Sequence, residues 1–89
     1  MEKIRKRSAG IDIGSREIYT SIGSGQIVCY PTFTEDLYVL RDYLLSHKIE
    51  TAAMEATGVY WVILYDILEQ AGIDVWLSLI HISEPTRPY

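Results

Sequence analysis

The sequence predicts one α/β domain built on a mixed β-sheet, and three observations support this class. The first third of the chain carries three short apolar or alternating segments separated by glycine and serine, which is typical of strands joined by tight turns. Two later stretches repeat apolar residues at helical spacing, and each leads into another short segment of strand type. Because a helix that joins two strands of one sheet requires them to be parallel, the sheet should combine both pairing directions.

The first three strands are expected in residues 8–15 (SAGIDIGS), 17–23 (EIYTSIG) and 26–33 (QIVCYPTF). Residues 17–23 alternate apolar and polar side chains, as a half-buried strand does. Ser24-Gly25 is a tight-turn signal, and Pro31 favours an edge strand or a strand end because proline cannot donate to a neighbouring strand. These segments predict an antiparallel meander.

The first helix is expected to begin at Thr34, whose hydroxyl can cap the free backbone amides of the first turn. Glu35 and Asp36 follow in that turn, where negative charge favours the positive end of the helix dipole. Its apolar residues recur at helical spacing and predict an amphipathic helix on the sheet. They are Leu37, Leu40, Tyr43 and Leu44.

A fourth strand is expected at residues 50–56 (ETAAMEA), although alanine and glutamate are poor strand formers. Thr57 is expected to cap a second helix, which Gly72 ends, and residues 73–76 begin a fifth strand. The apolar stripe of this helix is expected to comprise Tyr60, Ile63, Leu64, Ile67, Leu68 and Ala71.

The resulting order is strand, strand, strand, helix, strand, helix, strand. This is the order of the ribonuclease H-like (RuvC-like) fold, in which the first and fourth strands lie side by side at the centre of the mixed sheet. The expected fold is incomplete at the carboxyl end of the chain.

Composition indicates a soluble, cytoplasmic protein without a membrane segment. Of the 89 residues, 48% are hydrophobic, which is the range of globular chains. The single cysteine, Cys29, excludes an internal disulfide and is expected to be a small core residue. No segment resembles a signal peptide or a membrane helix.

The charge of the chain is unevenly distributed around its net value of -4. Residues 1–7 form a basic arm that can contact phosphates or simply keep the chain soluble. Residues 8–76 hold ten acidic and three basic side chains. This predicted domain is therefore no basic nucleic-acid patch.

The last residues, 77–89 (LSLIHISEPTRPY), match the translation of a tagmentation sequencing adapter in one frame. We expect this tail to be a gene-model artefact and the protein to be truncated, so its side chains receive no functional role.

Two carboxylates carry the predicted chemistry, because both interrupt apolar strands. By strand alternation Asp12 shares a face with Gly10 and Gly14, and Glu55 shares one with Ala53. Each acid should therefore project from a surface that small neighbours keep low. The alternative for either acid by itself is that it caps the turn that follows its strand.

The two acids would meet if their strands pair, since neighbouring strands lie only ~4.8 Å apart. Two close carboxylates repel each other unless a hard divalent cation lies between them, and oxygen ligands suit Mg²⁺ or Mn²⁺. We therefore expect a metal site of Asp12 and Glu55. Two such ions ~3.5–4 Å apart can stabilise the attacking and leaving oxygens of a phosphodiester.

Four neighbouring residues are candidate nucleic-acid contacts with simpler structural alternatives. Ser15 and Arg16 follow the first acid, where Ser15 can merely form the turn. Thr57 and Tyr60 follow the second, where the first can cap the helix and the second can belong to the core.

Two motifs resemble the DEDD class of insertion-sequence transposases, the IS one-ten group, whose amino-terminal domain is RuvC-like. Residues 10–17 (GIDIGSRE) are similar to the first strand of that family, and residues 54–61 (MEATGVYW) to its second acidic motif. The second octapeptide is the more specific, and the resemblance covers residues 8–76.

The resemblance implies metal-dependent DNA cleavage and joining, with Asp12 and Glu55 as the first two members of an acidic tetrad. The other two members and the carboxy-terminal domain with its serine have no counterpart here, so this fragment is expected to be inactive. The implied partners are DNA and further copies of the full-length protein, and a guide RNA stays open.

Two other functions compete with the transposase. Actin-like ATPases and sugar kinases approach ATP phosphates with an Asp-x-Gly-Ser/Thr turn, a pattern that Asp12, Gly14 and Ser15 satisfy. Such an enzyme has no need for Glu55 and its Thr-Gly-x-Tyr-Trp continuation. A non-catalytic interaction module is the second alternative.

Overall fold

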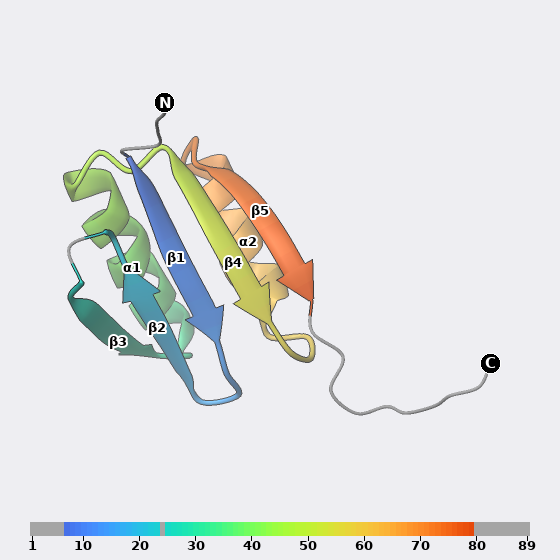
Figure 1. Cartoon of the computed structure of the whole chain (residues 1–89). Coiled ribbons are helices and arrows are strands. Elements are labelled where there is room, and N and C mark those ends of the chain that lie inside the picture. Colours follow the sequence, from blue (N-terminus) through green and yellow to red (C-terminus); the bar gives the residue numbers. More distant parts are fainter. Residues whose placement is uncertain (1–6, 24, 80–89) are drawn as a thin grey trace.

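A computed structural model describes residues 7–23 and 25–79 as a five-stranded sheet with two helices (Figure 1). The elements are β1 (Ser8–Ile13), β2 (Glu17–Ser21), β3 (Ile27–Pro31), α1 (Thr34–Ser46), β4 (Thr51–Ala56), α2 (Trp61–Gln70) and β5 (Asp74–Leu79). Their order along the chain is the predicted one, and the α/β class is confirmed.

The sheet is mixed, with the strand order β3-β2-β1-β4-β5. β1 pairs antiparallel with β2, and β2 pairs antiparallel with β3, as expected of a meander. β4 is parallel to both β1 and β5, because α1 carries the chain back from β3, which runs in the same direction as β1, and α2 carries it back from β4 to β5. The predicted neighbourhood of the first and fourth strands is therefore confirmed.

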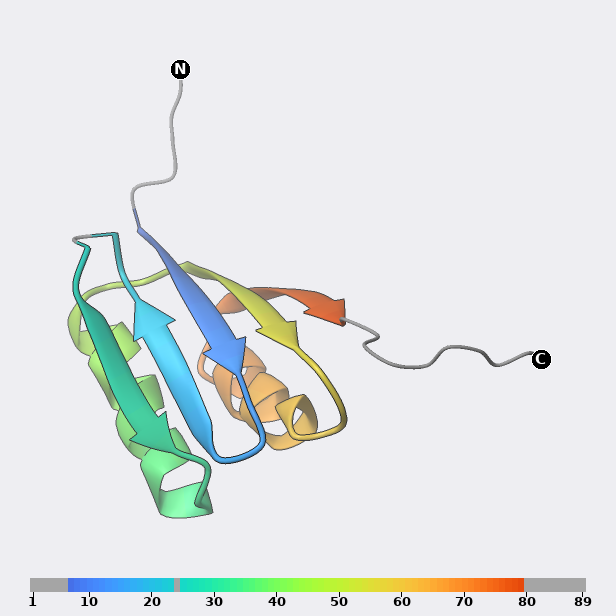
Figure 2. The ribbon, with the colours of Figure 1, turned by 60° about the horizontal axis from the view of Figure 1, so that its bottom comes forward.

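Both helices cover the same face of the sheet and leave the other face open (Figures 1 and 2). Strand alternation turns one row of each strand toward the helices, and these side chains form one core with the inner faces of α1 and α2. The largest fully buried side chains are Ile13, Ile18, Thr20, Leu40, Leu44, Met54, Leu64 and Leu68.

The predicted stripe of α1 is confirmed, but its predicted cap is wrong. Leu37, Leu40 and Leu44 are buried against the sheet. Thr34 is the first residue of the helix, and the N-cap position is Phe33, which makes no side-chain cap hydrogen bond. The carbonyl of Phe33 instead accepts the first helical hydrogen bonds, so the chain enters the helix one residue earlier than the hydroxyl pattern suggested.

The start of α2 is also corrected by the structure. The helix begins at Trp61 with Tyr60 at the N-cap, so Thr57 lies in the preceding loop and caps nothing. That loop turns at Gly58, whose φ of 85° is strained for other residues. Tyr60 and Ile63, both expected in the buried stripe, are more than half exposed, because the helix presents only a narrow face to the sheet.

Four of the five strands are one to three residues shorter than the segments predicted from the sequence, and β5 is longer. β1, β2 and β3 all end before the predicted boundaries, and Pro31 ends the edge strand β3 as expected. Cys29 is exposed, contrary to the expectation of a core cysteine, because it lies on the uncovered face of that edge strand. β5 continues to Leu79, three residues past the expected domain boundary.

Three predictions fall outside the described residues: the basic arm up to residue 6, Ser24 of the expected turn, and the suspected tail from residue 80 onward.

Within residues 7–23 and 25–79, α1 and α2 have 13 and 10 residues. Neither helix has the length and apolar character that crossing a bilayer requires.

Candidate functional site on the open face of the sheet

Asp12 and Glu55 lie opposite each other on the two neighbouring parallel strands. In the β1–β4 ladder they are register partners, one residue before the carboxyl end of each strand. Both side chains are exposed, whereas their chain neighbours in the strands are buried. The two carboxylates therefore project from the same, uncovered face of the sheet, at the spacing between adjacent strands, ~4.8 Å for the backbone.

The acid pair belongs to a row of register partners that crosses all five strands and begins at Cys29 on β3, the partner of Tyr19. Tyr19 on β2 is the register partner of Asp12, and Ser78 on β5 is the register partner of Glu55. From β3 to β5 the row thus reads cysteine, tyrosine, aspartate, glutamate, serine. Two oxygen acids are flanked by two hydroxyl groups on the open face.

The next row, two residues closer to the amino ends of β1 and β4, has small residues at its centre. Gly10 faces Ala53 there, and a Cβ built on Gly10 would meet no atom within 4 Å. Trp76, the partner of Ala53 on β5, is 66% exposed and forms the outer wall. On the opposite side, Ser21 on β2 and Ile27 on β3 continue this row.

These two rows line one hollow, which we call the sheet trough. Its lining residues on the open face are Gly10, Asp12, Tyr19, Ser21, Ile27, Ala53, Glu55, Trp76 and Ser78. One end of the trough carries the carboxylates, and the other carries the small residues Gly10 and Ala53 beside Trp76. Small floor residues therefore leave room beside the acids for a bulky group, as the alternation of the sequence predicted.

The carboxylates of the pair carry no internal partner among the described residues. Neither Asp12 nor Glu55 makes a hydrogen bond or an ion pair within residues 7–23 and 25–79. The interpretation of either acid as a cap of its following turn thus finds no contact in this part of the chain. Both groups are available to an external cation.

A third acid near the trough is already engaged. The hydroxyl of Tyr19 donates a hydrogen bond of 2.6 Å to Oε1 of Glu17. This bond, together with the negative charge of Glu17, raises the pKa of Tyr19 above its usual value of 10.0. Tyr19 is therefore a neutral phenol at physiological pH, and it adds no charge beside Asp12.

The four predicted contact residues lie in two loops at one edge of the sheet. Ser15 and Arg16 form the β1–β2 turn, and Thr57 and Tyr60 lie in the β4–α2 loop. Because β1 and β4 are parallel, these loops follow the carboxyl ends of the two acid-bearing strands (Figure 1). All four side chains are exposed.

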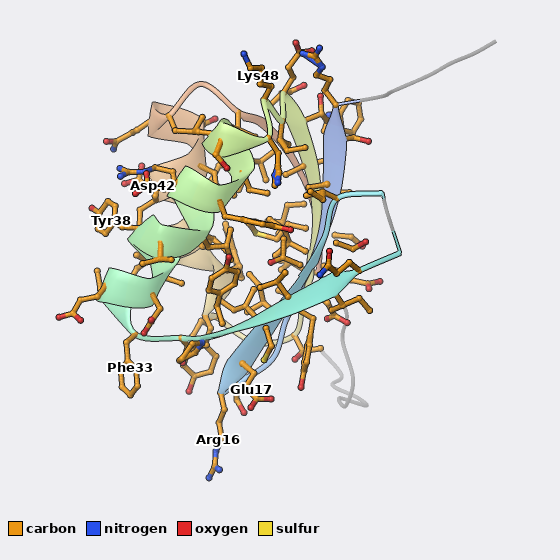
Figure 3. All side chains as sticks on the ribbon, turned by 90° about the vertical axis from the view of Figure 1, so that its left-hand side faces the viewer. Arg16, Glu17, Phe33, Tyr38, Asp42 and Lys48 are labelled. Carbon is orange, nitrogen blue, oxygen red and sulfur yellow. The ribbon has the colours of Figure 1, made fainter. Side chains whose placement is uncertain are left out.

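These four side chains do not line the trough as Asp12 and Glu55 do. Figure 3 shows Arg16 extending away from the sheet beyond its edge. The amide of Gly14 donates to the carbonyl of Glu17 over 2.9 Å and closes the turn, so Ser15 and Arg16 sit at its tip. The structure brings these residues near the site without turning them into the trough.

The sequence prediction missed Tyr19 and Trp76, and it gave no role to Ser78, which belongs to the suspected tail. The signal for Tyr19 was present, since it alternates with Ile18 and Thr20, which are buried, on a strand that follows the first acid directly. Trp76 and Ser78 depend on the extent and register of β5, which crosses the boundary expected at residue 76.

The donor set of the pair fits a hard divalent cation in its chemistry. Carboxylate oxygens are preferred ligands of Mg²⁺, which commonly binds through one or two carboxylates and completes its shell with water and phosphate oxygens. Among the described residues, no group of three or more histidine, cysteine, aspartate or glutamate side chains gathers in a metal-binding arrangement. Asp12 and Glu55 are thus the two candidate ligands in the trough among the described residues.

The chain matches no protein-family model and no curated protein. The fold and the geometry of the acid pair are therefore the observations on which a function can be based.

Proposed function

We propose that this chain is the amino-terminal part of a ribonuclease H-like transposase domain of the DEDD type. In the full-length protein the domain would take part in metal-dependent cleavage and joining of DNA strands. The observation that carries the proposal is the register pairing of Asp12 with Glu55 on the open face. Two acids that are 43 positions apart in the sequence become opposite neighbours on parallel strands.

The strand order supports the ribonuclease H-like part of the proposal. An antiparallel meander whose first strand pairs in parallel with a fourth strand is the arrangement expected of that fold. Helices on the other face leave the acid-bearing face free for a large substrate (Figure 2). The resemblance of residues 54–61 to the second acidic motif supports the choice of the transposase among enzymes of this shape.

In this proposal, Asp12 and Glu55 hold Mg²⁺ or Mn²⁺ through their carboxylate oxygens. The bound cation would offset their mutual repulsion and stabilise negative charge on a phosphodiester. The two further acids of the family tetrad would come from sequence outside this chain, so the fragment is proposed to be inactive by itself. DNA and further copies of the protein are the proposed partners, in the cytoplasm, and an RNA guide is compatible with the resemblance.

Paramagnetic broadening by Mn²⁺ tests the site on the chain as it exists. In a ¹⁵N-labelled sample, millimolar Mn²⁺ should broaden the amide signals around Asp12 and Glu55, because both carboxylates ligate the same ion. Asp12→Asn and Glu55→Gln should each abolish the selective broadening. Glu69→Gln is the matched control, since this exposed acid lies on α2 and the same charge is removed away from the trough.

Uniform weak broadening that is the same in all four proteins would contradict the proposal. The ATPase alternative predicts a different result, in which MgATP shifts the signals of Gly14 and Ser15 and Glu55→Gln changes nothing. Mn²⁺ binding that requires both acids, without a response to ATP, separates the two functions.

A further inference from the structure

The sheet trough has two chemically different halves side by side. The acid pair occupies one row of the sheet, and the Gly10–Ala53 floor with Trp76 occupies the next, two residues back along each strand. At ~3.3 Å per residue the rows are roughly 7 Å apart. A ligand that fills the trough must therefore combine an anionic group for the metal side with a flat apolar group for the floor.

Trp76 is held in position as an exposed platform. Its indole Nε1 donates a hydrogen bond of 3.2 Å to Asp74, two residues earlier on the same face of β5. The ring lines the trough and also a smaller hollow formed with Ser8, Ala9, Thr51 and Ala53. The register partner of Trp76 in the neighbouring strand is Ala53, whose side chain is a single methyl group, so there is room above Ala53 for a second flat ring.

Charge argues against a protein occupant. An apolar helix or a second copy seated in the trough would bury Asp12 and Glu55, and burying charges without partners is costly. The described residues offer four basic side chains, and two of them, Arg7 and Arg41, already pair with acids. A phosphate group bound through a divalent cation meets no such penalty.

We propose that the trough binds an unpaired nucleotide, with its base stacked on Trp76 and its phosphate beside the acid pair. This inference rests on the proposed function and adds a specificity residue to it. A base that remains paired and stacked within a duplex could not reach the floor of the trough, so the site would select single-stranded or locally opened DNA. Stacking on an aromatic side chain tolerates every base, so Trp76 would favour an unpaired base without selecting its identity.

The chain has two tryptophans, so the test uses a Trp61→Phe background, in which all tryptophan fluorescence comes from Trp76. A short oligothymidylate should quench the fluorescence of Trp76 in Mg²⁺ and should fail to do so in EDTA. In anisotropy measurements with the labelled oligonucleotide, Trp76→Ala should weaken binding by about fivefold to about 140-fold, the range of one lost stacking contact. Phe33→Ala is the control, since this 72% exposed aromatic lies at the start of α1 away from the trough (Figure 3).

Equal binding by Trp76→Ala, equal quenching in EDTA, or equal binding of a blunt duplex would overturn the inference. A concentration-dependent dimer that shields Trp76 would overturn it as well, in favour of a second copy. Mn²⁺ broadening on the same sample separates the two proposals: broadening at Asp12 and Glu55 without oligonucleotide binding removes the nucleotide site and leaves the metal site. Circular dichroism of Trp76→Ala, expected to match the parent because the side chain is exposed, excludes unfolding as the cause.

Discussion

Among single residues, Thr20 stands out because strand alternation buries its polar side chain in the apolar core. Its side chain is fully buried on β2, and its hydroxyl has no hydrogen-bond partner among the described residues. A buried hydroxyl without a partner loses its hydration and gains nothing in return. The position requires the shape of a β-branched side chain and makes no use of its oxygen.

Thr20→Val should therefore stabilise the domain, because valine keeps the shape and removes the unpaired oxygen. We expect a gain of about 1 kcal/mol in the free energy of unfolding. The midpoint of thermal unfolding should rise by about 4–8 °C in a domain of this size. Thr20→Ala is the control and should destabilise, since it opens a cavity as well; a loss of stability in Thr20→Val would mean that the hydroxyl has a partner.

At the scale of elements, both helices end in the same backbone motif with different residues. After α1, Lys48 adopts a φ of 57°, and its amide and that of Ile49 bond back to Leu45 and Leu44. After α2, Gly72 occupies the equivalent position with a φ of 89°. This left-handed position favours glycine, because a Cβ is strained there.

The pair predicts opposite effects of two substitutions. Lys48→Gly should stabilise the domain by about 1 kcal/mol by relieving the strain, and Gly72→Ala should destabilise it by a similar amount. Urea unfolding of the two variants beside the parent measures both. Effects of the same sign would show that the backbone at these ends differs from the motif.

The faces of α2 provide a second prediction at this scale. Leu64 is fully buried against the sheet, whereas Ile63 is 55% exposed. Leu64→Ala should cost about 2–5 kcal/mol, which is a large part of the stability of a domain this small. Ile63→Ala should change the free energy of unfolding little. Equal losses of stability for both variants in urea unfolding would show that Ile63 is buried in the core, as the sequence had predicted.

At the scale of the whole molecule, the proposed function makes a prediction about the gene. The suspected adapter begins at Leu77, inside a strand that the structure extends to Leu79. Resequencing of the genomic region without adapter should show a reading frame that continues beyond Trp76 into different residues, with two closely spaced aspartates downstream. An uninterrupted match to the present residues 77–89 followed by a stop codon would count against the transposase.

Much of the architecture was predictable because it depends on local patterns. Alternation and helical spacing predicted the seven elements in order, and the chain's two helical crossovers required β4 to be parallel to its neighbours. Helix starts were not predictable in this way, since capping depends on the path of the loop. Phe33 and Tyr60 occupy the cap positions that the hydroxyls of Thr34 and Thr57 were expected to take.

By itself, the sequence determined which residues alternate, where the strands and helices fall, and that two acids interrupt apolar strands among small neighbours. Tertiary structure alone decided that Asp12 and Glu55 are register partners and that Tyr19, Trp76 and Ser78 share their face. The reason is that a strand has a period of two, so a slip of one residue would turn every side chain to the opposite face. Register is set by packing across the whole sheet, and no single segment encodes it.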